Sequence, residues 1–199
     1  MKIKCLFLVA LILAVTSISF AQAKTKVKAS GIRSVDFLNY SYRSSVCSED
    51  LGTAKTVKFR KGRFKAAGNF FNIIGNKVIY ADADGDGSED AILQIICGAS
   101  NSSTLRLFEI PVYSFQNGRA KLLAKLDNKG LENDYQKYYP DGFLFVLAEN
   151  DVKVKNGHLI VEVLADGSYA DPENIATFDY EMSGGKFVLS GKPTIKPIK

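Results

Sequence analysis

Ala91-Ile92-Leu93-Gln94-Ile95-Ile96-Cys97 is the stretch that decides the fold, because six of its seven residues are apolar. An apolar run of this length, rich in β-branched isoleucine, predicts a central β-strand. The surrounding sequence should therefore supply the neighbouring strands of a sheet.

Outward from this strand, short apolar runs alternate with glycine-containing turns. Asn117-Gly118 and Asn156-Gly157 each separate two such runs, and Asn-Gly is among the strongest local signals for a β-hairpin. Gly75-Asn76 is a further turn signal, and Ser183-Gly184-Gly185 predicts a third late hairpin. Only 131–139 suggests a helical turn. We expect a mainly β fold, an antiparallel sandwich or small barrel built from Gly-turn hairpins.

The first 23 residues are typical of a secretory signal peptide. Two lysines precede the apolar stretch Cys5–Phe20, and Ala21-Gln22-Ala23 is a small-x-small cleavage site. An uncleaved membrane anchor is the alternative, although the uninterrupted apolar part is short for a bilayer, which takes about 20 residues. We expect a flexible N-terminus at 24–30, a single β-rich domain at 31–191 and a Pro-containing tail at 192–199.

Removal of the signal peptide changes the cysteine count and the charge. It takes away Cys5 and leaves Cys47 and Cys97, which are expected to pair because cysteines of exported proteins usually do. It also removes two lysines and no acid, so the formal charge of +5 falls to +3. The remaining charge is diffuse. We therefore expect no nucleic-acid partner and, after cleavage, no membrane span.

The sharpest chemical feature is the segment 82–90, which reads Asp-x-Asp-x-Asp-Gly-x-x-Asp. Calcium takes six to eight oxygen ligands, and carboxylates two residues apart on a tightly curled chain can converge on one ion. Gly87 permits the sharp turn after the third aspartate. The expected ligands are the four aspartates and the backbone carbonyl of one serine: Asp82, Asp84, Asp86, Ser88 and Asp90. An acidic β-turn without metal is the alternative interpretation.

The first half of this loop matches an EF-hand, but the position of the closing glutamate is Leu93. The flanking segments also predict strands instead of helices. The segment 79–91 resembles instead the strand–loop–strand calcium motif of FG-GAP repeats, in which the ninth-position aspartate completes the site. That resemblance implies calcium binding. With a single copy of the motif, it does not imply a propeller.

A broader resemblance rests on 35–42 with Cys47, the aspartate loop, Pro111-Val112-Tyr113 and 117–123. In this order the chain resembles a family of small exported bacterial proteins. The resemblance implies a bacterial exported protein and brings no activity with it.

The sequence contains little that predicts catalysis. His158 is the only histidine and follows a turn, where a strand-edge role is expected. Loop tyrosines at 135, 138, 139 and 169 could bind sugar or peptide, although packing over a sheet edge is commoner. An acid–base pair is conceivable among ten carboxylates: Glu109, Glu132, Asp134, Asp141, Glu149, Asp151, Glu162, Asp166, Asp171 and Glu173.

These features together predict a periplasmic or secreted domain with a structural calcium ion. Its expected role is binding an envelope or extracellular partner, and this role is favoured over an enzymatic one. The alternative is a carboxylate-dependent hydrolase acting on an extracellular or cell-wall polymer. A deep cleft lined by two carboxylates would favour the hydrolase.

Overall fold

The computed structural model describes residues 31–52, 55–66, 68–100, 107–145, 151–168 and 170–198. Strands dominate these residues, and every strand pair among them is antiparallel, which confirms the predicted mainly β class. The expected signal peptide at 1–23 and the N-terminal segment at 24–30 lie outside the described residues.

The first sheet is a five-stranded meander in the order β3-β4-β5-β6-β7. Consecutive strands pair with each other in the antiparallel sense throughout. Its strands are β3 (Arg63–Ala66), β4 (Asn69–Ala81), β5 (Asp90–Ala99), β6 (Leu107–Gln116) and β7 (Arg119–Asp127).

The second sheet has the order β11-β10-β9-β8. β11 pairs with residues 180–183 of β10, and β12 pairs with residues 174–177 of the same strand. Part of the expected C-terminal tail is therefore a strand of this sheet. Its strands are β8 (Val152–Lys155), β9 (His158–Ser168), β10 (Asp171–Ser183), β11 (Lys186–Leu189) and β12 (Thr194–Pro197).

Short elements complete the fold. Two 3-10 helices, η1 (Ile32–Ser34) and η2 (Phe37–Asn39), begin the described part of the chain. They are followed by the paired strands β1 (Ser41–Arg43) and β2 (Thr56–Lys58), with α1 (Val46–Leu51) between them. The helix α2 (Asn128–Gln136) follows β7 and overlaps the predicted helical turn.

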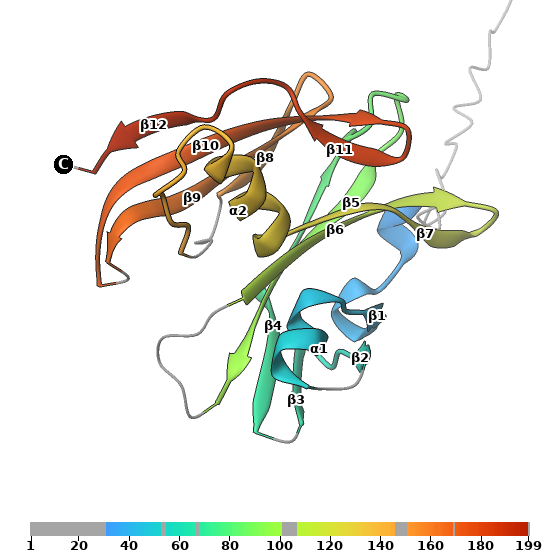
Figure 1. Ribbon diagram of the computed structural model, residues 1–199. Helices are drawn as coiled ribbons and strands as arrows, with labels where there is room; N and C mark the ends of the chain where they lie inside the picture. Colours follow the sequence, from blue (N-terminus) through green and yellow to red (C-terminus); the bar gives the residue numbers. More distant parts are fainter. Residues whose placement is uncertain are drawn as a thin grey trace, which may run out of the picture.

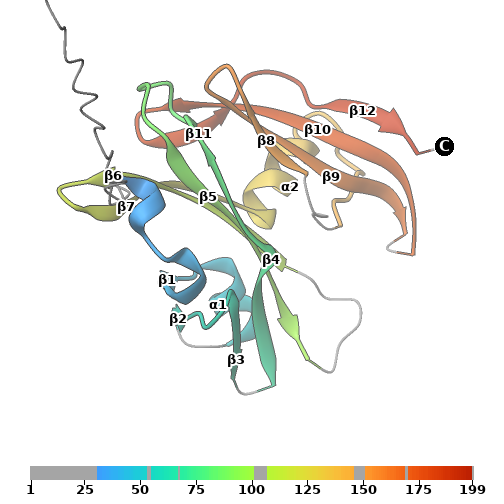
Figure 2. The same ribbon diagram turned by 180° about the vertical axis from the view of Figure 1, so that it is seen from behind.

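The molecule has three layers (Figure 1). The first sheet lies in the middle, the second sheet and α2 cover one face, and the N-terminal elements lie on the other side, as the reverse view also shows (Figure 2). Two hydrophobic clusters fill the two interfaces. Two open sheets packed face to face correspond more closely to the predicted sandwich than to a closed barrel.

The central strand β5 explains why its sequence is apolar almost throughout. Leu93 and Ile95 are fully buried in the N-terminal cluster, whereas Ile92 is fully buried in the cluster between the sheets. Successive side chains of a strand point to opposite faces. A strand that is covered on both faces therefore needs apolar residues at odd-numbered and even-numbered positions alike. Gln94 is the exception and is only 5% exposed.

The Asn-Gly turns form as predicted, with positive φ at both central residues of 117–118 and 156–157. Gly75-Asn76 behaves differently. Both residues have positive φ, but β4 continues through them, and its register with β5 shifts between Ile73 and Val78. This turn signal thus produces a bulge inside a 13-residue strand. Within the described ranges, no helix is long and apolar enough to cross a bilayer.

Candidate metal centre

The aspartate loop connects the end of β4 to the start of β5, as the strand–loop–strand interpretation requires. Its carboxylates organise the loop backbone. Asp82 accepts hydrogen bonds from the N–H groups of Gly85 (2.8 Å) and Gly87 (3.0 Å). Asp84 Oδ1 accepts from Asp86 N–H at 3.1 Å, and Asp86 Oδ1 accepts from Ser88 N–H at 2.7 Å. These bonds curl the chain and bring its carboxylates close to one another.

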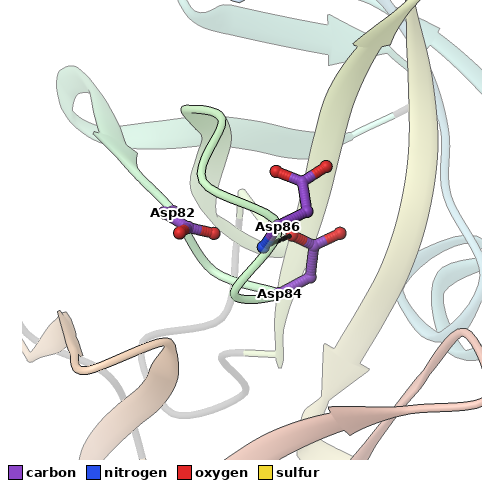
Figure 3. Close-up of side chains that lie close together, drawn as sticks. All are labelled: Asp82, Asp84 and Asp86. Carbon is purple, nitrogen blue, oxygen red and sulfur yellow. Dashed lines mark hydrogen bonds between the residues drawn. The ribbon is translucent and has the colours of Figure 1, made fainter.

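Three of the expected ligands come together. One carboxylate oxygen each from Asp82, Asp84 and Asp86 lies within 4.8 Å of the others, and Figure 3 shows the three side chains around the curled loop. Asp82 and Asp84 are half-buried and Asp86 is exposed. Three converging carboxylates can hold a metal ion, because an all-oxygen donor set suits hard divalent cations.

Asp90 stands behind this cluster as the first residue of β5 and is only 1% exposed. Its Oδ2 accepts a hydrogen bond from Ala83 N–H at 3.0 Å, whereas its buried Oδ1 has no hydrogen-bond partner. Burial raises the pKa of Asp90 to about 7, and the charges of Asp84, Asp86 and Asp82 act in the same direction. A buried oxygen without a donor beside three carboxylates is where a cation would be stabilised.

The other two predicted ligands, Ser88 and Asp90, lie outside the compact group of three aspartates. The charges of that group nevertheless add to the effect of burial in raising the pKa of Asp90. Ser88 is exposed, and its N–H is bonded to Asp86. The structure therefore brings together the first three predicted ligands and sets Asp90 as a buried carboxylate beneath them.

The loop is attached to the rest of the molecule at three points. Ala83 is fully buried in the cluster between the two sheets. Gly85 lies against the β8–β9 turn, where a Cβ added to Gly157 would be 3.4 Å from its Cα. Glu89 accepts hydrogen bonds from Arg33 at 2.6 and 2.7 Å, and this pairing lowers the pKa of Glu89. The loop thus contacts both sheets and η1.

The two cysteines of the domain meet away from this loop. Cys47 of α1 and Cys97 of β5 form a disulfide, with their Cα atoms 6.0 Å apart. The bond joins the N-terminal layer to the central strand of the first sheet. A disulfide of this kind is typical of an oxidising compartment.

Beside the disulfide lies a buried carboxylate that sequence reasoning did not single out. Glu109 of β6 is fully buried, and its Oε1 accepts from Ser44 Oγ (3.0 Å) and from the N–H groups of Ser45 (3.0 Å) and Cys47 (2.9 Å). Its Oε2 accepts from the Tyr42 hydroxyl and lies 3.6 Å from Lys125 Nζ. Burial raises the pKa of Tyr42, so this hydroxyl stays a donor.

A signal for Glu109 was present in the sequence, since it is an acid in the middle of the apolar run Leu107–Val112. An ionised group in such a run is buried only when its charge is paired and its oxygens are hydrogen-bonded. Because Glu109 is enclosed and saturated with donors, it cannot reach a polymer substrate in this conformation.

His158 and Tyr135, which the sequence offered for catalysis or ligand binding, both form hydrogen bonds within the domain. His158 Nδ1, at the start of β9, lies 2.6 Å from Asp179 Oδ1 of the neighbouring strand β10. Tyr135 is fully buried and donates to Asp166 at 2.8 Å, so it packs in the core instead of forming an aromatic surface. Tyr169 lies outside the described residues.

Comparisons with known protein families, with curated proteins and with solved structures find no match to this chain.

Proposed function

We propose that this chain is an exported calcium-binding β domain that acts as a binding module in the bacterial envelope. The observation that carries the proposal is the group formed by Asp82, Asp84 and Asp86, with the unpartnered oxygen of Asp90 behind it. Four carboxylates in nine residues repel one another, and a divalent cation among them would offset that repulsion.

The donor set favours calcium among the metals. All the side chains concerned offer oxygen, which disfavours zinc and copper, since these prefer nitrogen and sulfur ligands. The loop also has backbone carbonyls close by, and calcium accepts six to eight oxygens in a flexible geometry. Magnesium needs near-ideal octahedral geometry and usually keeps several waters. Asp82, Asp84 and Asp86 would hold the ion, with Asp90 supporting the site from beneath.

The role of the ion would be structural. The loop packs on the core through Ala83, on the second sheet through Gly85 and on η1 through Glu89. Fixing this loop would therefore fix the ends of both sheets relative to each other. An extracellular or periplasmic location supports occupancy, because sites in such modules work with dissociation constants of about 10⁻⁴–10⁻³ M.

The environment of Glu109 removes one of the ten candidate carboxylates from the hydrolase alternative. This carboxylate is fully buried and hydrogen-bonded by groups of the domain itself. Polymer hydrolysis needs two carboxylates that flank a bound substrate. Enclosed as it is, Glu109 does not meet that requirement.

Thermal unfolding with calcium, with magnesium and with chelator tests the calcium site. A ligand at 100 times its dissociation constant stabilises the folded state by about 2.7 kcal/mol. We expect calcium to raise the melting temperature more than magnesium does. Asp84→Asn should remove most of this rise, whereas Asp141→Asn, on an exposed loop, should keep it. Equal melting temperatures in calcium and chelator for the unaltered protein would refute the site.

A further inference from the structure

The bulge in β4 creates a groove beside the second sheet. Ile73 pairs with Ile95 and Val78 pairs with Leu93, so residues 74–77 of β4 stand opposite the single residue Gln94 of β5. A cavity of about 500 Å³ opens there, with walls from β4, β5 and β8. That volume lies in the range of small-molecule sites, about 300–1,000 Å³.

Gln94 supplies an unsatisfied polar group to this groove. The residue is 5% exposed and lines the cavity, and its Nε2 is buried without a hydrogen-bond partner. Leaving a buried donor unpaired costs about 1–3 kcal/mol. A buried amide without an acceptor, between the apolar residues Leu93 and Ile95, points to an acceptor that arrives from outside the chain.

The charges around the groove have one sign. Arg33, Lys77 and Lys153 line it, and no acidic residue is among its lining residues. Arg33 lies over the ring of Tyr80, 4.5 Å from its centroid, and is paired with Glu89; Lys153 is paired with Glu162. For Lys77, the part of the chain that is described contains no acidic group within 4.0 Å. Its ammonium group is therefore the cation left to meet an incoming anion.

The rest of the lining is apolar. Ile74, Ile79 and Val152, which pack against the cluster between the sheets, line it together with Val78 and Tyr80, which pack against the N-terminal cluster. A ligand with a charged head alone would leave this surface uncovered, whereas an apolar body would bury it at about 25 cal/mol per Å².

We propose that the groove binds a small organic carboxylate with an apolar body. One carboxylate oxygen accepts the hydrogen bond from Gln94 Nε2, the ammonium group of Lys77 balances the charge, and the apolar body covers Ile74 and Ile79. This site is separate from the proposed calcium site, because none of its lining residues belongs to the loop 82–90. If the proposed function as a binding module is right, small organic carboxylates would be the class of ligand that the module binds.

Three probes that share one body test this proposal: 4-phenylbutyrate, 4-phenylbutanol and 4-phenylbutylamine. Each is titrated, in calcium buffer, into the protein as the cell produces it, and binding is followed by ¹H–¹⁵N NMR. We expect the acid to bind at least about tenfold more tightly than the alcohol and the amine to bind most weakly, because a hydrogen bond to a charged group contributes about 1.5–3 kcal/mol. The side-chain amide signal of Gln94 should shift most with the acid, because a carboxylate is a stronger acceptor than a hydroxyl.

Two variants locate the site. Gln94→Leu keeps the volume and removes the orphaned donor, so it should fold and should bind the acid about tenfold less tightly, with a smaller loss for the alcohol, whose hydroxyl is a weaker acceptor. Lys77→Glu is exposed and should weaken acid binding at least as much. Lys121→Glu, on the exposed face of β7, is the matched control and should have no effect.

Two outcomes would overturn the proposal. One is that the acid and the alcohol bind equally, or that neither variant changes acid binding, since the groove would then be a non-selective apolar depression. The other is that none of the three probes binds at millimolar concentration.

Discussion

Asp90 Oδ2 accepts a hydrogen bond from the backbone N–H of Ala83 at 3.0 Å, across the base of the aspartate loop. This bond closes the loop and holds the carboxylate in a buried position, where its other oxygen has no partner. The bond therefore orders the loop. It also keeps the negative charge of Asp90 buried, where ionisation is unfavourable. Without a cation, Asp90 should be a source of instability.

The first prediction concerns the pH dependence of the metal-free protein. Burial raises the pKa of Asp90 from 3.8 to about 7, so the folded protein holds this proton more tightly than the unfolded chain does. The stabilisation from the bound proton is complete below about pH 4 and is lost as the pH rises to about 7. In chelator, the free energy of unfolding should fall over this range by more than it does in Asp90→Asn.

Urea unfolding of both proteins at several pH values measures this difference. Asparagine can still accept the hydrogen bond from Ala83, so the variant isolates the charge. Parallel curves for the two proteins would show that Asp90 titrates normally and that its carboxylate is not held as described.

The second prediction concerns the contact between the loop and the β8–β9 turn. Gly157 and Gly118 occupy equivalent positions in two Asn-Gly turns, with φ of 77° and 76°. Asparagine tolerates this conformation, so the backbone cost of Gly→Asn should be similar at both. Only Gly157 of the two has a neighbour: a Cβ there would lie in van der Waals contact with Gly85 Cα at 3.4 Å, whereas nothing lies within 4 Å of a Cβ at Gly118.

An asparagine at 157 would be placed against the loop and one at 118 in open space, so Gly157→Asn should lower the free energy of unfolding more than Gly118→Asn, and only Gly157→Asn should reduce the calcium-induced rise in melting temperature. Calorimetry of both variants with calcium and with chelator measures both quantities. If the two variants behave alike, the contact with Gly85 does not support the loop.

Much of the fold follows from local patterns in the sequence. The apolar run at Ala91–Cys97 predicts the central strand, and the Asn-Gly pairs at 117–118 and 156–157 predict two hairpins, because the required positive φ values are accessible to these residues. Gly75-Asn76 carries a similar local signal but forms a bulge. The continuation of β4 depends on pairing with β5, which no local pattern contains.

The candidate site divides in the same way. Asp82, Asp84 and Asp86 are close in sequence, so their convergence could be predicted from their spacing. Two other contacts could not be predicted from spacing, because they join segments more than 50 residues apart. These are the contacts of Gly85 with the β8–β9 turn and of Glu89 with Arg33. The groove at Gln94 depends on a register shift and was invisible for the same reason.

The third prediction concerns Glu109, which joins β6 to α1 and the segment before it. Glu109→Gln removes the charge that faces Lys125 and presents an amide group to donors that need an acceptor. Breaking a buried ion pair costs about 3–5 kcal/mol, so we expect a loss of about 3 kcal/mol in urea unfolding. Glu162→Gln breaks the exposed pair with Lys153 and should cost less than about 1 kcal/mol. Equal effects would mean that Glu109 is not a structural centre.

The fourth prediction concerns the disulfide between Cys47 and Cys97, which closes a loop over a sequence separation of 50. The chain-entropy relation gives about 4 kcal/mol for a loop of this size. Reduction should lower the free energy of unfolding by about this amount. The double variant Cys47→Ala, Cys97→Ala should match the reduced protein and should not respond to reductant.

Counting free thiols in the unfolded, unreduced protein tests this pairing and the processing of the N-terminus together. If the predicted signal peptide is removed and takes Cys5 with it, no reactive thiol is expected, because the other two cysteines are bonded to each other. One thiol would mean that Cys5 is retained while the bridge is intact. Two or three thiols would mean that Cys47 and Cys97 are unpaired, and the stability difference on reduction should then vanish as well.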